Sequence, residues 1–104
     1  MPNHLLDFQA LQQQVLPQLT TIIPQLLPDG RMRGCEYIAR NPKRSDRRLG
    51  SFKVNIRAGR WCDFATGDAG GDIISLCAYL QGLSQHKAAL YLVEKLGLSG
   101  RVAL

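Results

Sequence analysis

Residues 50–65 read GSFKVNIRAGRWCDFA, and their pattern indicates the β-structure around which the rest of the chain is arranged. Apolar and polar side chains alternate along its first half, with Phe52, Val54 and Ile56 on one face and Ser51, Lys53, Asn55 and Arg57 on the other. A period of two is typical of a β-strand that buries one face. The pair Ala58-Gly59 is a turn signal, and residues 60–64 then return as a second strand. The stretch therefore predicts a β-hairpin with one buried face.

The hairpin is flanked by one more strand and by two helices. Residues 36–39 form a short strand candidate before it. Behind it, apolar residues at helical spacing predict helices over 72–81 and 84–97, with Asp72 and Ser84 as their N-caps. The predicted fold class is α+β, with a small antiparallel three-stranded sheet followed by two helices.

Residues 1–30 have a different pattern, with apolar residues at a spacing of three to four that predicts helices over 5–16 and again after Pro17. Pro24 is expected to end or kink the second of these helices. We interpret this segment as an N-terminal helical arm. Its apolar face offers a docking site for a partner protein, formed by Leu19, Ile22, Ile23 and Leu26.

Positive charge is concentrated in the middle of the chain. The whole sequence carries a net charge of +5, but residues 31–60 alone hold ten Lys and Arg against two acids, Glu36 and Asp46. So many like charges repel one another unless a polyanion neutralises them. We expect phosphate contacts from Arg40, Lys43, Arg44, Arg47 and Arg48, and an extension of this track across the hairpin by Lys53, Arg57 and Arg60.

Four aromatic residues lie within or just beyond this basic segment. Proteins that bind single-stranded nucleic acid combine such cations with aromatic faces on which bases stack. Phe52 and Phe64 are assigned to the core of the sheet. Tyr37 and Trp61 are the candidates for base stacking, and the core is the alternative for both.

The sequence favours neither a cofactor nor a catalytic site. The glycine-rich loop at 67–72 lacks the Lys-Ser/Thr pair of a phosphate-binding loop. Cys35, Cys62 and Cys77 are not arranged in the closely spaced pairs that structural zinc sites use, so zinc is kept only as the alternative to no metal. Because no catalytic constellation stands out, enzymatic activity is left open, and no turnover is expected from the chain alone.

An odd number of cysteines and a start without a secretory signal favour a reducing, cytoplasmic location. No apolar run has the roughly 18 residues that a membrane span needs, so no membrane partner is expected.

The segment from Gly34 to Leu98 resembles the N-terminal zinc-ribbon-like domain of phage and plasmid DNA primases and primase–helicases. The resemblance is carried by the order of three motifs: Gly50-Ser51-Phe52, then Trp61-Cys62-Asp63-Phe64, then Gly70-Gly71-Asp72 before an apolar helix. It implies a ribbon fold and a role in engaging single-stranded template DNA. It divides the chain into the arm 1–30, a ribbon-like domain 31–98 and a tail 99–104.

The chain departs from that family at the metal. The four ligand positions of the ribbon correspond to Cys35, Ile38, Cys62 and Ala65, and two ligands cannot close a tetrahedral site. A ribbon without zinc must be held by its core, for which we name Phe52, Val54, Trp61, Phe64, Leu76 and Leu80.

Two hypotheses follow from the sequence. In the first, the protein is a non-catalytic module of a DNA replication system that holds single-stranded template DNA for a primase of a mobile element. In the second, it is an accessory subunit that docks on a primase, polymerase or helicase through its N-terminal helices.

Overall fold

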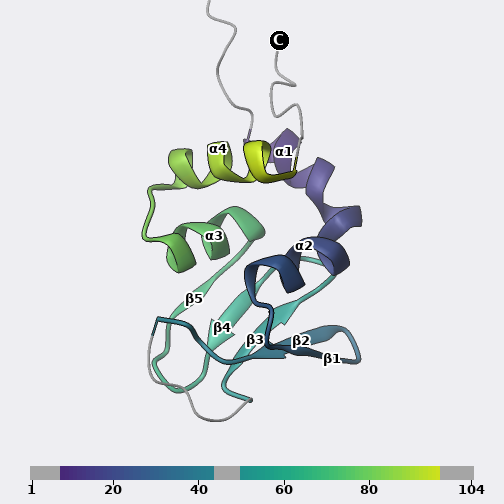
Figure 1. Ribbon diagram of the computed structural model, residues 1–104, viewed down its shortest axis with the longest axis vertical. Helices are drawn as coiled ribbons and strands as arrows, with labels where there is room; N and C mark the ends of the chain where they lie inside the picture. The colour runs from purple at the N-terminus through teal and green to yellow at the C-terminus, as the bar shows by residue number, and fades with distance from the viewer. Residues whose placement is uncertain (1–7, 44–49, 97–104) are drawn as a thin grey trace, which may run out of the picture.

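The computed structural model describes residues 8–43 and 50–96. The predicted tail and the first residues of the predicted arm therefore lie outside the described residues, as do Arg44, Arg47 and Arg48. Within the described ranges, five strands form one antiparallel sheet in the order β1-β2-β3-β4-β5, with helices on one side of it (Figure 1).

Strands β2 (Glu36–Ala39), β3 (Phe52–Asn55) and β4 (Trp61–Asp63) are the three that the sequence predicts. The prediction of α+β structure is confirmed, but the number of strands is wrong. The sheet also contains β1 (Arg31–Arg33), which pairs with β2, and β5 (Ala69–Gly70), which pairs with β4.

The hairpin between β3 and β4 follows from its turn. The side chain of Asn55 accepts hydrogen bonds of 2.9 Å from the backbone N–H groups of Arg57 and Ala58. Gly59 then adopts a φ of +82°, where a residue with a side chain would be strained, and its N–H donates to the Asn55 carbonyl. This turn returns the chain so that Val54 lies opposite Trp61.

Helix α3 (Ile73–Gln81) and helix α4 (Gln85–Leu96) follow the sheet as predicted. The Asp72 carboxylate accepts a 2.7 Å hydrogen bond from the Ser75 N–H, which caps the start of α3. The hydroxyl of Ser84 accepts one from the Lys87 N–H at the start of α4. Both predicted capping residues are confirmed.

The N-terminal residues belong to the same core as the sheet. Helix α1 (Phe8–Val15) leads through one turn of 3-10 helix (Leu16–Gln18) into α2 (Leu19–Leu26), which continues past Pro24. One cluster of buried side chains includes residues of α1 and α2 together with those of β2, β3, β4, α3 and α4. The boundary predicted at residue 30 therefore does not separate two cores, and the segment described from residue 8 onward is not a free arm.

The sheet has two different faces. Its inner face carries Tyr37, Phe52, Val54 and Trp61, which are buried against the helices. We call the opposite side the outer face; it carries Arg31, Arg33, Glu36, Ile38, Lys53, Asn55 and Cys62. None of the helices within residues 8–43 and 50–96 has the length and apolar character needed to cross a bilayer.

Candidate nucleic-acid interface

Strand pairing places a row of side chains across the outer face. Arg31 lies opposite Ile38, Ile38 opposite Lys53, and Lys53 opposite Cys62. Residues directly opposite in an antiparallel sheet share a face, so these side chains are neighbours although they come from four strands. Strands lie about 4.8 Å apart, so the row spans roughly 14 Å.

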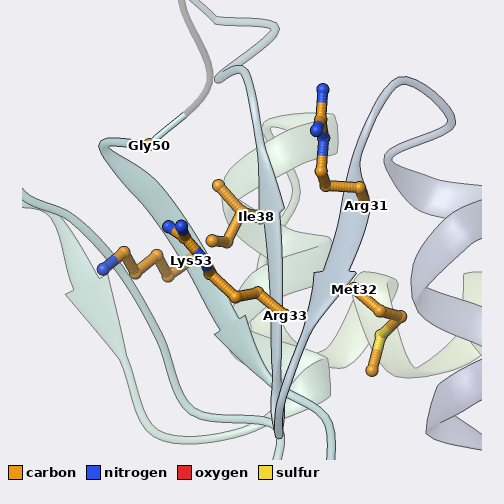
Figure 2. A pocket seen from close by; sticks show the side chains of 6 residues that line it. All are labelled: Arg31, Met32, Arg33, Ile38, Gly50 and Lys53. Atoms are coloured by element: carbon orange, nitrogen blue, oxygen red, sulfur yellow. The ribbon is translucent and has the colours of Figure 1, made fainter.

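Two grooves on this face share one lysine. The first has a volume of about 440 Å³ and is lined by Arg31, Met32, Arg33, Ile38, Gly50 and Lys53. Figure 2 shows Arg33, Lys53 and Ile38 on the same side of the sheet, with Met32 extending away from them. The second, of about 340 Å³, is lined by residues that include Lys53, Asn55, Arg60 and Cys62. Lys53 therefore lies between Arg31 and Arg33 on one side and Arg60 on the other.

The charge on the outer face is predominantly positive. Arg31, Arg33 and Arg60 are exposed, and the structure describes one acidic residue beside them, Glu36. The Glu36 carboxylate lies 4.0 Å from the Lys53 ammonium. An exposed pair at this distance contributes little to stability, about 0–1 kcal/mol. The cations are thus available to an anionic ligand at small cost.

Phe64 is the aromatic side chain that the structure exposes on this side. It is 68% exposed, although the sequence assigns it to the core. The reason is alternation: Asp63, the last residue of β4, is fully buried, so the residue that follows it points to the other side. The Lys53 ammonium lies 5.3 Å from the centre of its ring.

Trp61 does not have the stacking role predicted for it. It is 5% exposed and packs against Phe52 and Tyr79, with ring centres 5.9 and 4.6 Å away. The β5 backbone covers the edge of the Trp61 ring. Gly70 lies so close to this ring that a Cβ added to it would be 2.4 Å from the indole Nε1. That Nε1 is buried without a hydrogen-bond partner in the described part of the chain. The core alternative for Trp61 is therefore the correct one.

Tyr37 is also a core residue. It is 3% exposed, and its hydroxyl donates a 2.5 Å hydrogen bond to the Leu27 carbonyl and accepts one from the Gly30 N–H. The ring lies directly against Gly30, where a Cβ would be 2.3 Å from it. A ring enclosed in this way has no face on which a base can stack. Tyr37 instead fastens the turn after α2 to the sheet.

A polar network, buried at Asn41 and Asp63 and exposed at Asp68, holds the start of the basic loop. The Asn41 side-chain amide donates to the carboxylate of Asp63 and to the hydroxyl of Tyr79, both at 2.8 Å. The Tyr79 hydroxyl in turn donates to the Asp68 carboxylate at 2.7 Å. Burial and the nearby Asp68 carboxylate raise the pKa of Tyr79 above its usual value, so the phenol stays protonated and keeps donating. The network is a structural anchor.

The other predicted phosphate contacts are dispersed. The Lys43 ammonium lies 5.2 Å from the centre of the Tyr79 ring, on the side of α3 and away from the outer face. Arg40 follows the end of β2 and is exposed, and Arg57 is exposed in the hairpin turn. Of the cations named from the sequence that lie within residues 8–43 and 50–96, Lys53 and Arg60 are the two that the structure brings together at one groove.

The predicted docking residues are buried. Leu19, Ile22 and Ile23 are at most 1% exposed and belong to the core cluster, while Leu26 is half-buried against it. These side chains hold α2 against the rest of the molecule and do not form an exposed apolar face. The sequence prediction of a partner surface at these four residues is therefore wrong.

The three cysteines, Cys35, Cys62 and Cys77, are free and form no disulfide. Cys62 lies on the outer face, and burial, followed by the Glu36 carboxylate, raises the pKa of its thiol. Burial raises the pKa of Cys77 to about 11. Among residues 8–43 and 50–96, no three His, Cys, Asp or Glu side chains come together as a possible metal site.

Three residues on or beside the outer face were not predicted as site residues: Arg31, Arg33 and Phe64. The two arginines alternate around Met32, a pattern that would have placed both on one face had residues 31–33 been assigned to a strand. Trp61, three residues before Phe64, could have indicated that Phe64 is exposed. If Trp61 is buried, a residue an odd number of positions further along an extended chain faces the opposite way.

Comparisons with known protein families, with curated proteins and with solved structures find no match for this chain.

Proposed function

We propose that this protein is a non-catalytic module that binds single-stranded DNA on the outer face of its sheet. The observation that carries the proposal is the placement of four cations, Arg31, Arg33, Lys53 and Arg60, along two adjoining grooves with Glu36 as their described acidic neighbour. Contacts of Arg and Lys with phosphate dominate the affinity of proteins for nucleic acids.

The arrangement of the layers favours a single strand over a duplex. Proteins commonly read a duplex by inserting a helix into its major groove. Here the described helices pack on the inner face, so the cationic side presents a sheet (Figure 1). Sheet surfaces with cations and an accessible aromatic ring are typical of modules for single-stranded nucleic acid.

The wider role in a replication system rests on the resemblance of residues 34–98 to the ribbon-like domain of mobile-element primases. In that role the module holds the template while a separate catalytic unit makes the primer. The second hypothesis, docking on a primase, polymerase or helicase through Leu19, Ile22, Ile23 and Leu26, has no exposed apolar surface at these residues to support it.

Fluorescence anisotropy tests the proposal with a labelled single strand of about 16 nucleotides, within the usual site size of such modules, and with the matching duplex. The protein is treated with EDTA so that metal plays no part. If each of the four cations neutralises one phosphate, the logarithm of the association constant falls with the logarithm of salt with a slope of about −3. The proposal would be overturned if the protein did not bind the single strand at low salt, or if its association constant did not change with salt concentration.

A further inference from the structure

We propose that Phe64 is the platform on which one base stacks, and that Lys53, which lies over its ring in the free protein, leaves the ring to contact a phosphate when the base arrives. This inference rests on the proposed function and deepens it, because it makes unpaired bases part of what the site recognises. A plain polyanion would satisfy the cations but would leave the ring unused.

Hydrogen bonds hold the backbone around Phe64 while its side chain is exposed. Its N–H donates a 2.8 Å hydrogen bond to the Ser51 carbonyl. The preceding Asp63 is fully buried, accepts from Asn41 and accepts from the Ala65 N–H at 2.8 Å. The backbone on both sides of Phe64 is therefore fixed, so a base that stacks here does not have to order the chain first.

The ring of Phe64 lies beside the two cationic grooves. Among the described residues the large apolar side chains that are exposed are Met32, Phe64 and Leu90, and of these Phe64 is the most exposed. It is the aromatic one, and it lies beside the lysine that joins the two cationic grooves. Stacking of a base on an aromatic ring and contact of a phosphate with a cation are the two elements of a single-strand site.

Lys53 and an incoming base compete for the Phe64 ring. The Lys53 ammonium is 5.3 Å from the ring centre and 4.0 Å from the Glu36 carboxylate, so in the free protein it has two weak partners. An exposed cation–π contact is worth about 0.5–1 kcal/mol. A base and an ammonium cannot occupy the same face of one ring. Without a base, the ammonium contacts a phosphate from its place over the ring. A base that takes this face displaces the ammonium, and the phosphate contact then replaces both of its weak partners.

Two oligomers separate the parts of the site: a labelled oligothymidylate of about twelve nucleotides, and a deoxyribose-phosphate oligomer of equal length without bases. Phe64→Leu keeps an apolar, exposed side chain but removes the ring. We expect it to weaken binding of the oligothymidylate about tenfold. Binding of the abasic oligomer and the salt slope should not change. Leu90→Ala, on the exposed side of α4, is the matched control and should change neither affinity.

Lys53→Met tests the exchange. It keeps most of the stem and removes the charge, so we expect a salt slope that is shallower by about 0.7 on both oligomers. Because the ring no longer has to be cleared, the preference for the oligothymidylate over the abasic oligomer should rise about two- to fivefold. An unchanged preference would show that the lysine does not compete for the ring and would overturn the exchange.

Phe64→Trp gives a direct readout of stacking, because it adds an exposed indole to a protein whose Trp61 is buried. Its fluorescence should be quenched by the oligothymidylate and not by the abasic oligomer. If Phe64→Leu binds both oligomers as tightly as the unmodified protein while Arg33→Glu weakens both, the stacking platform is wrong and the cationic site stands. If the unmodified protein binds neither oligomer at low salt, the proposed function itself is wrong.

Discussion

The side-chain amide of Asn41 donates a 2.8 Å hydrogen bond to the carboxylate of Asp63, and both residues are at most 1% exposed. Asn41 follows the end of β2, and Asp63 is the last residue of β4. The bond therefore fastens the beginning of the basic loop to the strand that displays Phe64. The same amide group donates to Tyr79 of α3, so three parts of the fold meet at one side chain.

Asn41→Ala is expected to destabilise the protein by about 2 kcal/mol, because it leaves the buried Asp63 carboxylate without this donor. Urea unfolding followed by circular dichroism measures the loss. Gln81→Ala, at an exposed position near the end of α3, is the control and should change the free energy of unfolding very little. Equal stability of the two variants would show that the network contributes nothing.

Tyr37→Phe tests the structural role of Tyr37. Without the hydroxyl, the Leu27 carbonyl and the Gly30 N–H lose a partner, so we expect a loss of about 1–2 kcal/mol in urea unfolding. The affinity for single-stranded DNA should stay within about twofold, because the ring is enclosed. If the variant lost much of its affinity for single-stranded DNA while its free energy of unfolding stayed the same, Tyr37 would have the stacking role predicted from the sequence.

Cys62 reports on occupancy of the outer face, since it lies opposite Lys53. Its thiol has a raised pKa and the thiolate is the reactive form, so alkylation by iodoacetamide should speed up as the pH is raised above neutral. We expect bound single-stranded DNA to slow this reaction severalfold, measured by mass spectrometry in a Cys35→Ser background. Cys77, buried and with a pKa of about 11, should react only after unfolding. If bound DNA does not change the rate at which Cys62 is alkylated, the DNA binds elsewhere on the protein.

The sequence predicts best where local chemistry decides the structure. The alternation through Phe52 and Val54, the turn at Gly59 and the caps Asp72 and Ser84 each depend on neighbouring residues, and all are confirmed. Strands β1 and β5 have no such local signature. All three residues of β1 are exposed, and β5 has only two residues in a glycine-rich loop; both exist because a neighbouring strand offers them hydrogen bonds.

The candidate site was harder to predict, because composition does not tell which face of a strand a residue occupies. Trp61 and Phe64 are both aromatic and three residues apart, yet one is buried and the other is 68% exposed. Alternation places the two side chains on opposite faces, but which of the two faces the helices cover is a tertiary property. The same holds for Ile22 and Ile23: a helical apolar stripe that packs inside the protein has the same sequence pattern as one that binds a partner.

A matched pair of charge reversals shows whether single-stranded DNA binds to the outer face of the sheet. Arg33→Glu changes a groove residue and Lys87→Glu changes an exposed residue of α4; both alter the net charge equally. Salt-dependent anisotropy with one single-stranded oligonucleotide measures both variants. We predict that Arg33→Glu weakens binding about tenfold near physiological salt and makes the salt slope shallower, while Lys87→Glu has a small effect on both. Equal weakening by the two variants would contradict the account, because affinity would then depend on total charge and not on this face.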